Sequence, residues 1–137
     1  MANWNEIFDI YESNDVDSLV EIAHHHALRI KQYLMDIGYS SGEASALTHA
    51  VAYYFIEHDG FFDGGEGDVF KGVFGTEDKY YKDIRIYRTD GYKQKIELII
   101  RNAPRSVREE IGRFASALYS GRGYISDSER TLIKSFN

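Results

Sequence analysis

Cysteine is absent from this chain of 137 residues, and proline occurs once, at Pro104. Without cysteine the chain has no disulfide, no thiolate ligand for a metal and no cysteine nucleophile. A single proline suits a helical chain, because proline inside a helix removes a backbone hydrogen bond. Since 43% of the residues are apolar, we expect one domain with a hydrophobic core of its own.

Long apolar runs are absent as well. No segment approaches the roughly 18 consecutive apolar residues that a membrane-spanning helix needs. The start of the chain, MANWNEIFDI, lacks the basic stretch and apolar run of a secretory signal. These two absences predict a cytoplasmic protein without a membrane span.

The sequence motifs of common enzyme classes are missing. There is no GxGxxG, no GxxxxGK followed by Ser or Thr, no GxSxG and no HExxH. Three histidines are consecutive, at positions 24–26. On a helix their side chains would point about 100° apart, so they cannot all bind one ion. The sequence therefore predicts a protein that is not an enzyme.

Charge is divided unevenly along the chain. Residues 1–78 contain 15 acidic and 3 basic side chains, whereas residues 79–137 contain 7 acidic and 13 basic ones, and the net charge is −6. Such asymmetry indicates a steered encounter with a charged partner, or self-association of opposite faces. The simpler interpretation is that both stretches form solvated helix faces that lie near one another.

A basic face is predicted in the second half of the chain. Four residues recur every three positions and form one broad helix face, namely Lys79, Lys82, Arg85 and Arg88. The positive zone continues with Lys93, Lys95, Arg101, Arg105 and Arg108. Because the overall pI is about 5.3, we expect the first four residues to contact a protein partner rather than nucleic acid.

Apolar residues recur every three or four positions along most of the chain, a pattern typical of amphipathic helices. Helices are predicted over residues 3–12, 18–37, 42–58 and 105–120. The third of them is apolar nearly all round, which indicates the central and most buried helix. Residues 76–101 favour two helices joined at Asp90-Gly91 over a β-hairpin with its turn at the same place.

Part of the sequence occurs twice, in residues 52–73 and 115–136. The two segments align without a gap, so that Gly60 pairs with Gly123 and Glu66 with Glu129. Each copy predicts a helix, a glycine turn with positive φ and a second helix. The two glutamates are predicted at the third position of a capping box. The predicted fold class is an all-α, single-domain helical bundle of about seven helices with two pseudo-repeated helical hairpins.

The turn of the first copy is acidic. Glu57, Asp59, Asp63, Glu66 and Asp68 lie close together with no basic residue among them. Ca²⁺ prefers carboxylate and carbonyl oxygens as ligands, and glycines let the backbone bend around the ion. Asp59, Asp63 and Glu66 are therefore a candidate site for a divalent cation. The competing interpretation is structural, because Asp63 and Glu66 also have capping roles.

Two helical hairpins with corners of this kind resemble the tellurite-resistance TerB-like family. The resemblance is carried by HDGFFDGGE at 58–66, PRSVREE at 104–110 and GYISDSE at 123–129. It implies an all-helical bundle and a scaffold or metal-associated module, found near stress-response, phage-defence and tellurite-resistance systems. It also implies the metal corner at Asp59, Asp63 and Glu66. The second corner carries Arg122 and Ser126 in place of the two aspartates.

We therefore expect a non-enzymatic interaction module of TerB-like type that acts through charged helical faces in a stress- or phage-related setting. Two alternatives stay open. One is a sensor of a divalent cation such as calcium that uses the acidic corner at residues 57–68. The other is a small acidic inhibitor or immunity protein that occupies a basic surface of its partner.

Overall fold

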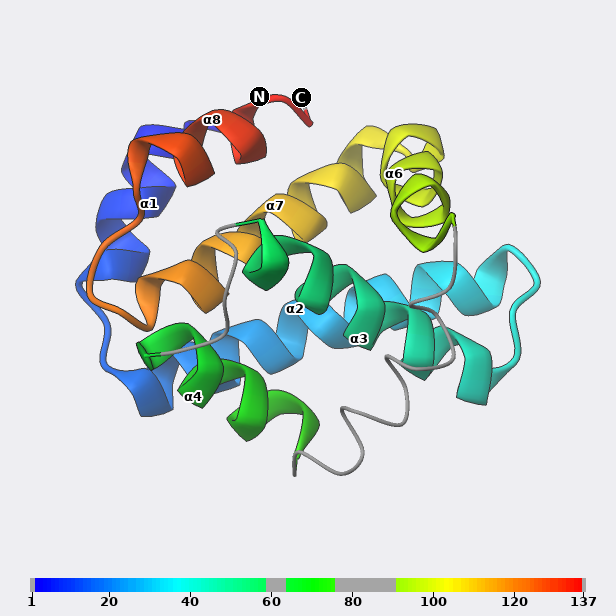
Figure 1. The fold of residues 1–137 in the computed structure, drawn as a ribbon, viewed down its shortest axis with the longest axis horizontal. Coiled ribbons are helices and arrows are strands. Elements are labelled where there is room, and N and C mark those ends of the chain that lie inside the picture. The colour runs from blue at the N-terminus through cyan, green and yellow to red at the C-terminus, as the bar shows by residue number, and fades with distance from the viewer. Residues whose placement is uncertain (1, 59–63, 76–90, 137) are drawn as a thin grey trace.

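The computed structural model describes residues 2–58, 64–75 and 91–136 (Figure 1). These ranges contain seven helices and no strand, which confirms the predicted all-α fold class. In chain order the helices are α1 (Trp4–Glu12), α2 (Val16–Asp36), α3 (Ser41–Glu57), α4 (Gly64–Phe74), α6 (Tyr92–Asn102), α7 (Arg105–Ser120) and α8 (Asp127–Lys134). None of these helices has both the length and the apolar character needed to cross a membrane.

Side-chain caps explain where several helices begin. Asp15 accepts a hydrogen bond from the backbone N–H of Ser18 at 2.8 Å and starts α2. Ser40 and Glu43 form a complete capping box at the start of α3. Such caps satisfy N–H groups that the first turn of a helix leaves without a partner.

The predicted capping box of the second repeat copy is confirmed. Ser126 precedes α8 and accepts from the N–H of Glu129, whose carboxylate accepts from the N–H of Ser126 at 2.8 Å. Gly123 has the predicted positive φ, 93°. Asp63 lies outside the described residues, so the equivalent box at Glu66 stays a prediction, as does the structural equivalence of the two copies.

Helix α7, rather than α3, is the centre of the bundle. The prediction is right that α3 buries many residues, among them Leu47, Val51 and Phe55. It is wrong about the position, because α7 packs against all six of the other described helices. Small residues along α7, such as Ala115 and Ala117, let neighbours approach from several sides. Figure 1 shows α7 crossing the middle of the molecule, with α2 running beside it.

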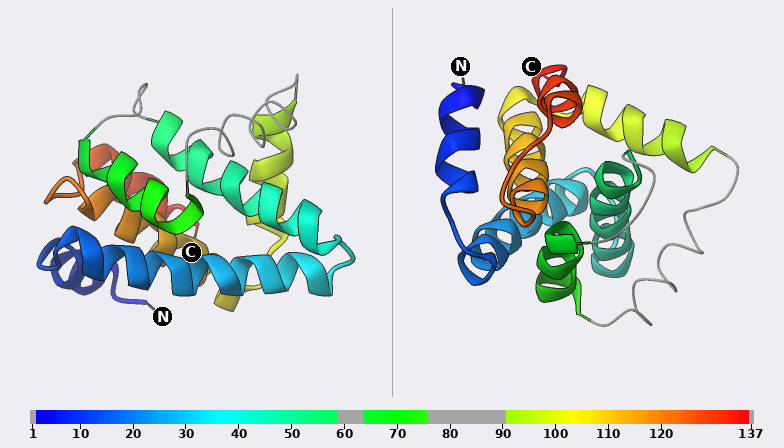
Figure 2. Two further views of the ribbon diagram at one scale, coloured as in Figure 1. Left: turned by 90° about the horizontal axis from the view of Figure 1, so that it is seen from below. Right: turned by 60° about the vertical axis from the view of Figure 1, so that its left-hand side comes forward.

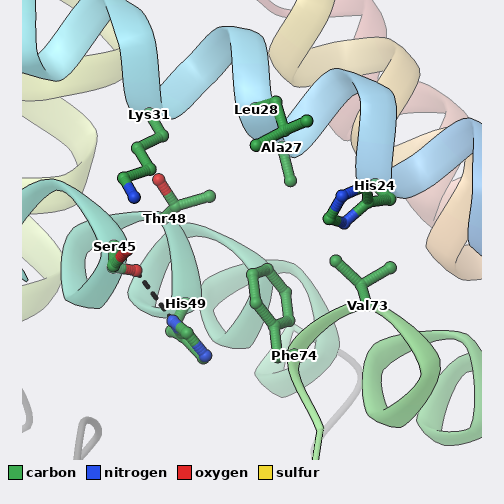
Figure 3. A pocket seen from close by; sticks show the side chains of 9 residues that line it. All are labelled: His24, Ala27, Leu28, Lys31, Ser45, Thr48, His49, Val73 and Phe74. Atoms are coloured by element: carbon green, nitrogen blue, oxygen red, sulfur yellow. Dashed lines mark hydrogen bonds between the residues drawn. The ribbon is translucent and has the colours of Figure 1, made fainter. Parts of the chain in front are cut away.

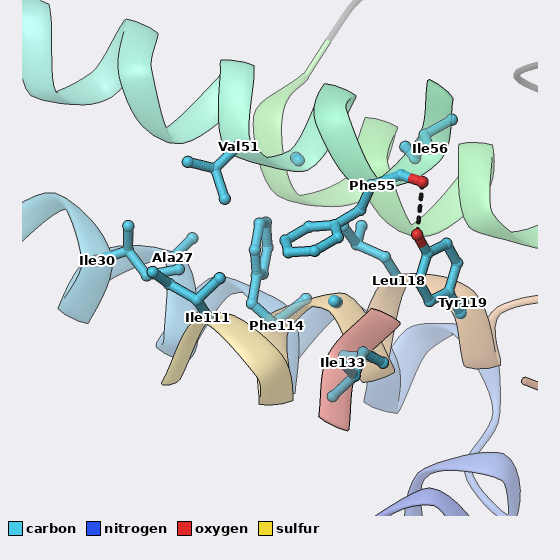
Figure 4. Packing of buried hydrophobic residues seen from close by; sticks show 14 of the residues in the cluster. Ala27, Ile30, Val51, Phe55, Ile56, Ile111, Phe114, Leu118, Tyr119 and Ile133 are labelled. Carbon is cyan, nitrogen blue, oxygen red and sulfur yellow. Dashed lines mark hydrogen bonds between the residues drawn. The ribbon is translucent and has the colours of Figure 1, made fainter. Parts of the chain in front are cut away.

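One cluster of buried apolar side chains receives residues from all seven described helices. Figure 4 shows the part of it where residues of α2, α3, α7 and α8 meet. Phe55 of α3 and Phe114 of α7 are both fully buried at its centre. The hydroxyl of the buried Tyr119 donates a hydrogen bond to the backbone carbonyl of Phe55 at 2.5 Å. This bond joins the ends of α3 and α7 and satisfies a polar group that would be costly to bury alone.

The end of the ambiguous segment at 76–101 is helical. Residues 92–102 form α6, which packs against α3 and α7 on the side away from α1 (Figure 2, right). This confirms the predicted helix after Asp90-Gly91 and excludes a strand in the second arm of a hairpin. Residues 76–90 lie outside the described part of the chain, and the helix predicted there stays a prediction.

Candidate functional site

The acidic corner predicted to bind a metal is only partly described. Asp59 and Asp63 lie outside the described residues, so the prediction of a cation site made with Glu66 stays a prediction. Within residues 2–58, 64–75 and 91–136, no cluster of three or more His, Asp and Glu side chains has the arrangement of a metal site. His58, the histidine nearest the corner in sequence, contacts the hydroxyl of Ser128 through Nε2 at 3.1 Å.

Glu66 contacts an arginine that the repeat alignment places opposite Asp59. Its Oε2 lies 3.1 Å from Nε of Arg122, and a terminal nitrogen of the same guanidinium hydrogen-bonds Glu129. The two glutamates are only 2% and 0% exposed. Burial alone would lower the pKa of Arg122, but Glu129 and Glu66 outweigh it, so the pKa is raised and the guanidinium stays charged. Sequence reasoning missed this ion pair because it treated the two corners separately.

The uneven division of charge is partly neutralised inside the fold. Among the described residues, three ion pairs join an acidic residue of the first half to a basic residue of the second. They are Glu12–Arg130, Glu57–Lys93 and Glu66–Arg122. The two oppositely charged stretches therefore do lie near one another, as the simpler interpretation of the sequence expects, although Glu66 is buried rather than solvated. Partner binding is then left to basic residues that lie outside such pairs, or that are exposed and only loosely paired, as Lys93 is at 3.8 Å from Glu57.

A pocket of about 180 Å³ lies between α2, α3 and α4 (Figure 3). Its lining combines apolar side chains with His24 of α2 and His49 of α3. Nδ1 of His49 lies 2.7 Å from the backbone carbonyl of Ser45, so this nitrogen carries the proton and donates. The His49 ring also packs on Phe74, with 4.0 Å between ring centroids. The pocket thus combines two imidazoles and two hydroxyl groups with an apolar wall.

A second pocket, of about 370 Å³, opens between α3, α6, α7 and α8, and we call it the basic pocket. It is lined by Tyr54, Glu97, Ile100, Arg101, Arg108, Leu132, Ser135 and Phe136. Two guanidinium groups and one carboxylate thus share a cavity whose remaining wall is largely apolar. The two arginines belong to the positive zone that the sequence predicts beyond Arg88. The other lining residues were not predicted as a site, since they come from α3, from α6 and from α8 with the two residues after it.

The carboxylate of the basic pocket already has a partner. The hydroxyl of Tyr54 donates a hydrogen bond to Oε1 of Glu97 at 3.4 Å. Burial, and then the neighbouring Glu97, raise the pKa of Tyr54, so its hydroxyl keeps the proton that it donates. Nε of Arg108 is buried and has no hydrogen-bond partner in the described part of the chain. Neither Arg101 nor Arg108 forms an ion pair with a described carboxylate.

A hydrogen-bonded cluster of polar side chains lies in the junction of α1, α2 and α7. Nδ1 of His26 lies 2.6 Å from Oε2 of Glu110, and Nε2 lies 2.9 Å from the hydroxyl of Tyr11. Arg29 contacts the other oxygen of Glu110 at 3.0 Å. Since a carboxylate only accepts, Nδ1 donates to Glu110 and Tyr11 donates to Nε2. All of these groups are satisfied when His26 is neutral, which suits a structural link between the helices.

The four residues predicted to contact a partner, Lys79, Lys82, Arg85 and Arg88, lie outside the described residues, and this prediction is therefore neither confirmed nor contradicted. The described continuation of the same positive zone runs along α6 and the first turn of α7. Lys93, Lys95, Arg101 and Arg105 are exposed there, while Arg108 reaches into the basic pocket.

Comparison of the chain with protein-family models, with curated proteins and with solved structures finds no match. The resemblance to the TerB-like family consequently rests on the sequence motifs alone and stays a prediction.

Proposed function

We propose that this protein is a non-enzymatic interaction module of TerB-like type that binds an acidic segment of a protein partner. The contact surface in this proposal is the basic surface of α6 and the first turn of α7, together with the predicted contact residues between 79 and 88. A cytoplasmic setting and a stress- or phage-related system belong to the same proposal.

The observation that carries the proposal is the position of Arg101 and Arg108. Other basic residues of the second half, such as Arg122 and Arg130, are held by carboxylates inside the fold. These two arginines make no ion pair with a described carboxylate, and both border one pocket. Positive groups that the fold leaves available beside a cavity attract and orient an acidic partner.

The described residues favour binding over catalysis for a second reason. Each of the two pockets described above lacks a nucleophile in contact with a general base, the arrangement on which covalent catalysis depends. The polar groups instead form caps, ion pairs and links between helices. An interaction module needs only a stable surface of the right charge and shape, which these residues provide.

The test is binding of a dye-labelled peptide of ten glutamates, followed by fluorescence anisotropy. Replacing Lys93 and Arg105 with Glu reverses two exposed charges of the basic surface without altering the lining of the basic pocket. We expect affinity to fall by about tenfold or more, and binding by the unmodified protein to weaken as salt is raised.

The matched control replaces Lys71 on α4 and Lys134 on α8 with Glu, which changes the net charge by the same amount. These residues lie away from the basic surface, so affinity should change by less than about threefold. An equal loss in the two double variants would mean that only net charge matters, and would reject the proposed surface.

A further inference from the structure

We propose that the basic pocket binds a single carboxylate group that is attached to a short apolar side chain. This inference rests on the proposed function and specifies which chemical group of the acidic partner is recognised. The ligand enters between α6 and α7, places its carboxylate against Arg101 and Arg108, and packs its apolar part on Ile100, Leu132 and Phe136.

The charge of the pocket matches a monoanion. Arg101 and Arg108 contribute two positive charges, and Glu97 contributes one negative charge, so the lining carries one net positive charge. A single carboxylate neutralises that charge, whereas a doubly charged phosphate would leave an excess of negative charge beside Glu97. Charge complementarity therefore favours a monoanion, such as a carboxylate, over a dianion.

The hydrogen-bonding groups point to the same ligand. Nε of Arg108 is buried without a hydrogen-bond partner among the described residues, a costly state that a bound acceptor relieves. Guanidinium groups bind carboxylates through paired N–H donors. Glu97 is not this acceptor in the structure, because its Oε1 accepts from Tyr54 and it forms no ion pair with either arginine.

The apolar wall of the pocket indicates what is attached to the carboxylate of the ligand. Ile100 is almost fully buried, and Leu132 and Phe136 are partly buried against the core while lining the cavity. A volume of about 370 Å³ holds a carboxylate together with one aliphatic side chain. Burial of that side chain adds apolar contact to the charged hydrogen bonds, so the pocket should prefer an amphipathic anion to a bare one.

The experiment titrates the full chain with hexanoate and with hexanamide, the uncharged analogue of the same size. Binding is followed by ¹H–¹⁵N NMR through the backbone signals of α6 and the Nε–H signals of the arginines. We expect hexanoate to bind in the millimolar range, to shift the Nε–H signal of Arg108, and to bind at least about tenfold more tightly than hexanamide.

Three variants test the assignment. Arg108→Gln and Arg101→Gln should each weaken hexanoate binding by about tenfold, since each removes a charged donor. Lys134→Gln is the matched control, because Lys134 is exposed on α8, a helix that borders the pocket, but does not line the pocket itself. It should leave the affinity unchanged. Because Arg101 is exposed, Arg101→Gln should fold normally. It therefore still tests the pocket if Arg108→Gln proves poorly folded.

Several results would overturn the inference. Equal affinity for hexanoate and hexanamide would exclude recognition of the charge. Equal loss in the Lys134 and Arg101 variants would exclude the pocket, and inorganic phosphate binding as tightly as hexanoate would exclude a carboxylate preference.

Two peptides identify where the carboxylate comes from in a protein. One is acetylated and amidated, with an internal glutamate beside leucine, and the other ends in leucine with a free carboxyl group. Tighter binding of one peptide in the same pocket assigns a side-chain or a chain-terminal carboxylate, and binding of neither contradicts the inference.

The hexanoate and glutamate-peptide experiments distinguish failure of the pocket from failure of the proposed function. Suppose that binding of the glutamate peptide still depends on Lys93 and Arg105, but that hexanoate does not bind. That result would support the basic surface and reject the pocket. Hexanoate binding without any binding of the glutamate peptide would reject the surface and retain the pocket.

Discussion

Arg108 and Arg122 lie near opposite ends of α7, and their surroundings differ. Arg122 contacts two buried glutamates, one from α4 and one from α8. Arg108 faces a pocket and makes no ion pair with a described carboxylate. Both side chains are partly buried, so burial does not separate them. The difference lies in whether the fold itself supplies the negative charge.

The comparison distinguishes a structural arginine from a binding one. Removal of a cation that lies between buried carboxylates leaves those carboxylates in a medium that solvates them poorly. Removal of a cation that faces an open pocket leaves nothing buried behind, because water can enter. Stability should therefore depend on Arg122, and ligand binding on Arg108.

The largest effect is expected for Arg122→Met. Glu66 and Glu129 would stay buried without this guanidinium, so the free energy of unfolding should fall by about 3–5 kcal/mol. Urea denaturation of the full chain measures it. Arg108→Met, with the same chemical change, should alter the free energy by less than about 0.5 kcal/mol. A similar loss in the two variants would remove the distinction between the two sites.

The next effect concerns the contact that holds α4 beside the end of α7. Gly65 is the second residue of α4, and a Cβ atom there would lie 1.7 Å from the backbone oxygen of Gly121. Gly65→Ala should therefore separate the two backbones near Arg122 and lower the free energy of unfolding by about 1–3 kcal/mol. Thermal unfolding measured by circular dichroism checks this.

Gly42 provides the matched control for Gly65. It is the second residue of α3, and nothing lies within 4 Å of a Cβ atom built on it. Gly42→Ala should stabilise the protein by about 0.4–1 kcal/mol, because alanine restricts the unfolded chain more than glycine does. Changes of the same sign in the two variants would argue against close backbone contact at Gly65.

The smallest expected effect is a pH dependence of stability caused by His26, a side chain that, unlike the two arginines, can lose its positive charge. Glu110 of α7 pairs with His26, which also faces Tyr11, His25 and Arg113. Burial lowers the pKa of His26 below its usual value of about 6.5, although Glu110 opposes this. Protonation is thus less favourable in the folded than in the unfolded chain. The contribution to stability is complete above about pH 6.5 and is lost as the pH falls through the pKa of the folded state.

The free energy of unfolding measured between pH 7.5 and 5 checks this prediction. Unmodified protein should lose stability with a slope of at most about 1.4 kcal/mol per pH unit from this group. His26→Gln should flatten that part of the curve, whereas His25→Gln, at an exposed neighbouring position, should preserve it. Unchanged slopes in the His26 variant would rule out His26 as the titrating group.

Local features of the sequence predicted the helices well. Helix α1 begins and ends within one residue of the predicted range of 3–12, and α7 matches 105–120. The cap at Ser126 was predicted because a capping box needs only a serine and a glutamate three residues apart. Such patterns depend on neighbours in the chain, which a sequence displays directly.

The prediction of the central helix failed for the opposite reason. Segment 42–58 was predicted to be central because it is apolar nearly all round, whereas α7 carries several charged residues. In the fold, Glu110 and Arg113 of α7 point into the junction with α1 and α2, where they contact other polar groups. Polar positions can be central when partners from other helices satisfy them.

The sequence by itself determined the helical fold class, most helix boundaries and the division of charge, because helix periodicity and capping are short-range. Only the tertiary structure decided which charges neutralise one another. Glu66 meets Arg122, and Glu12 meets Arg130, across long stretches of chain. Ion pairing depends on distance in space and on burial, so Arg101 and Arg108 could be recognised as available for a partner only after the chain had been folded around them.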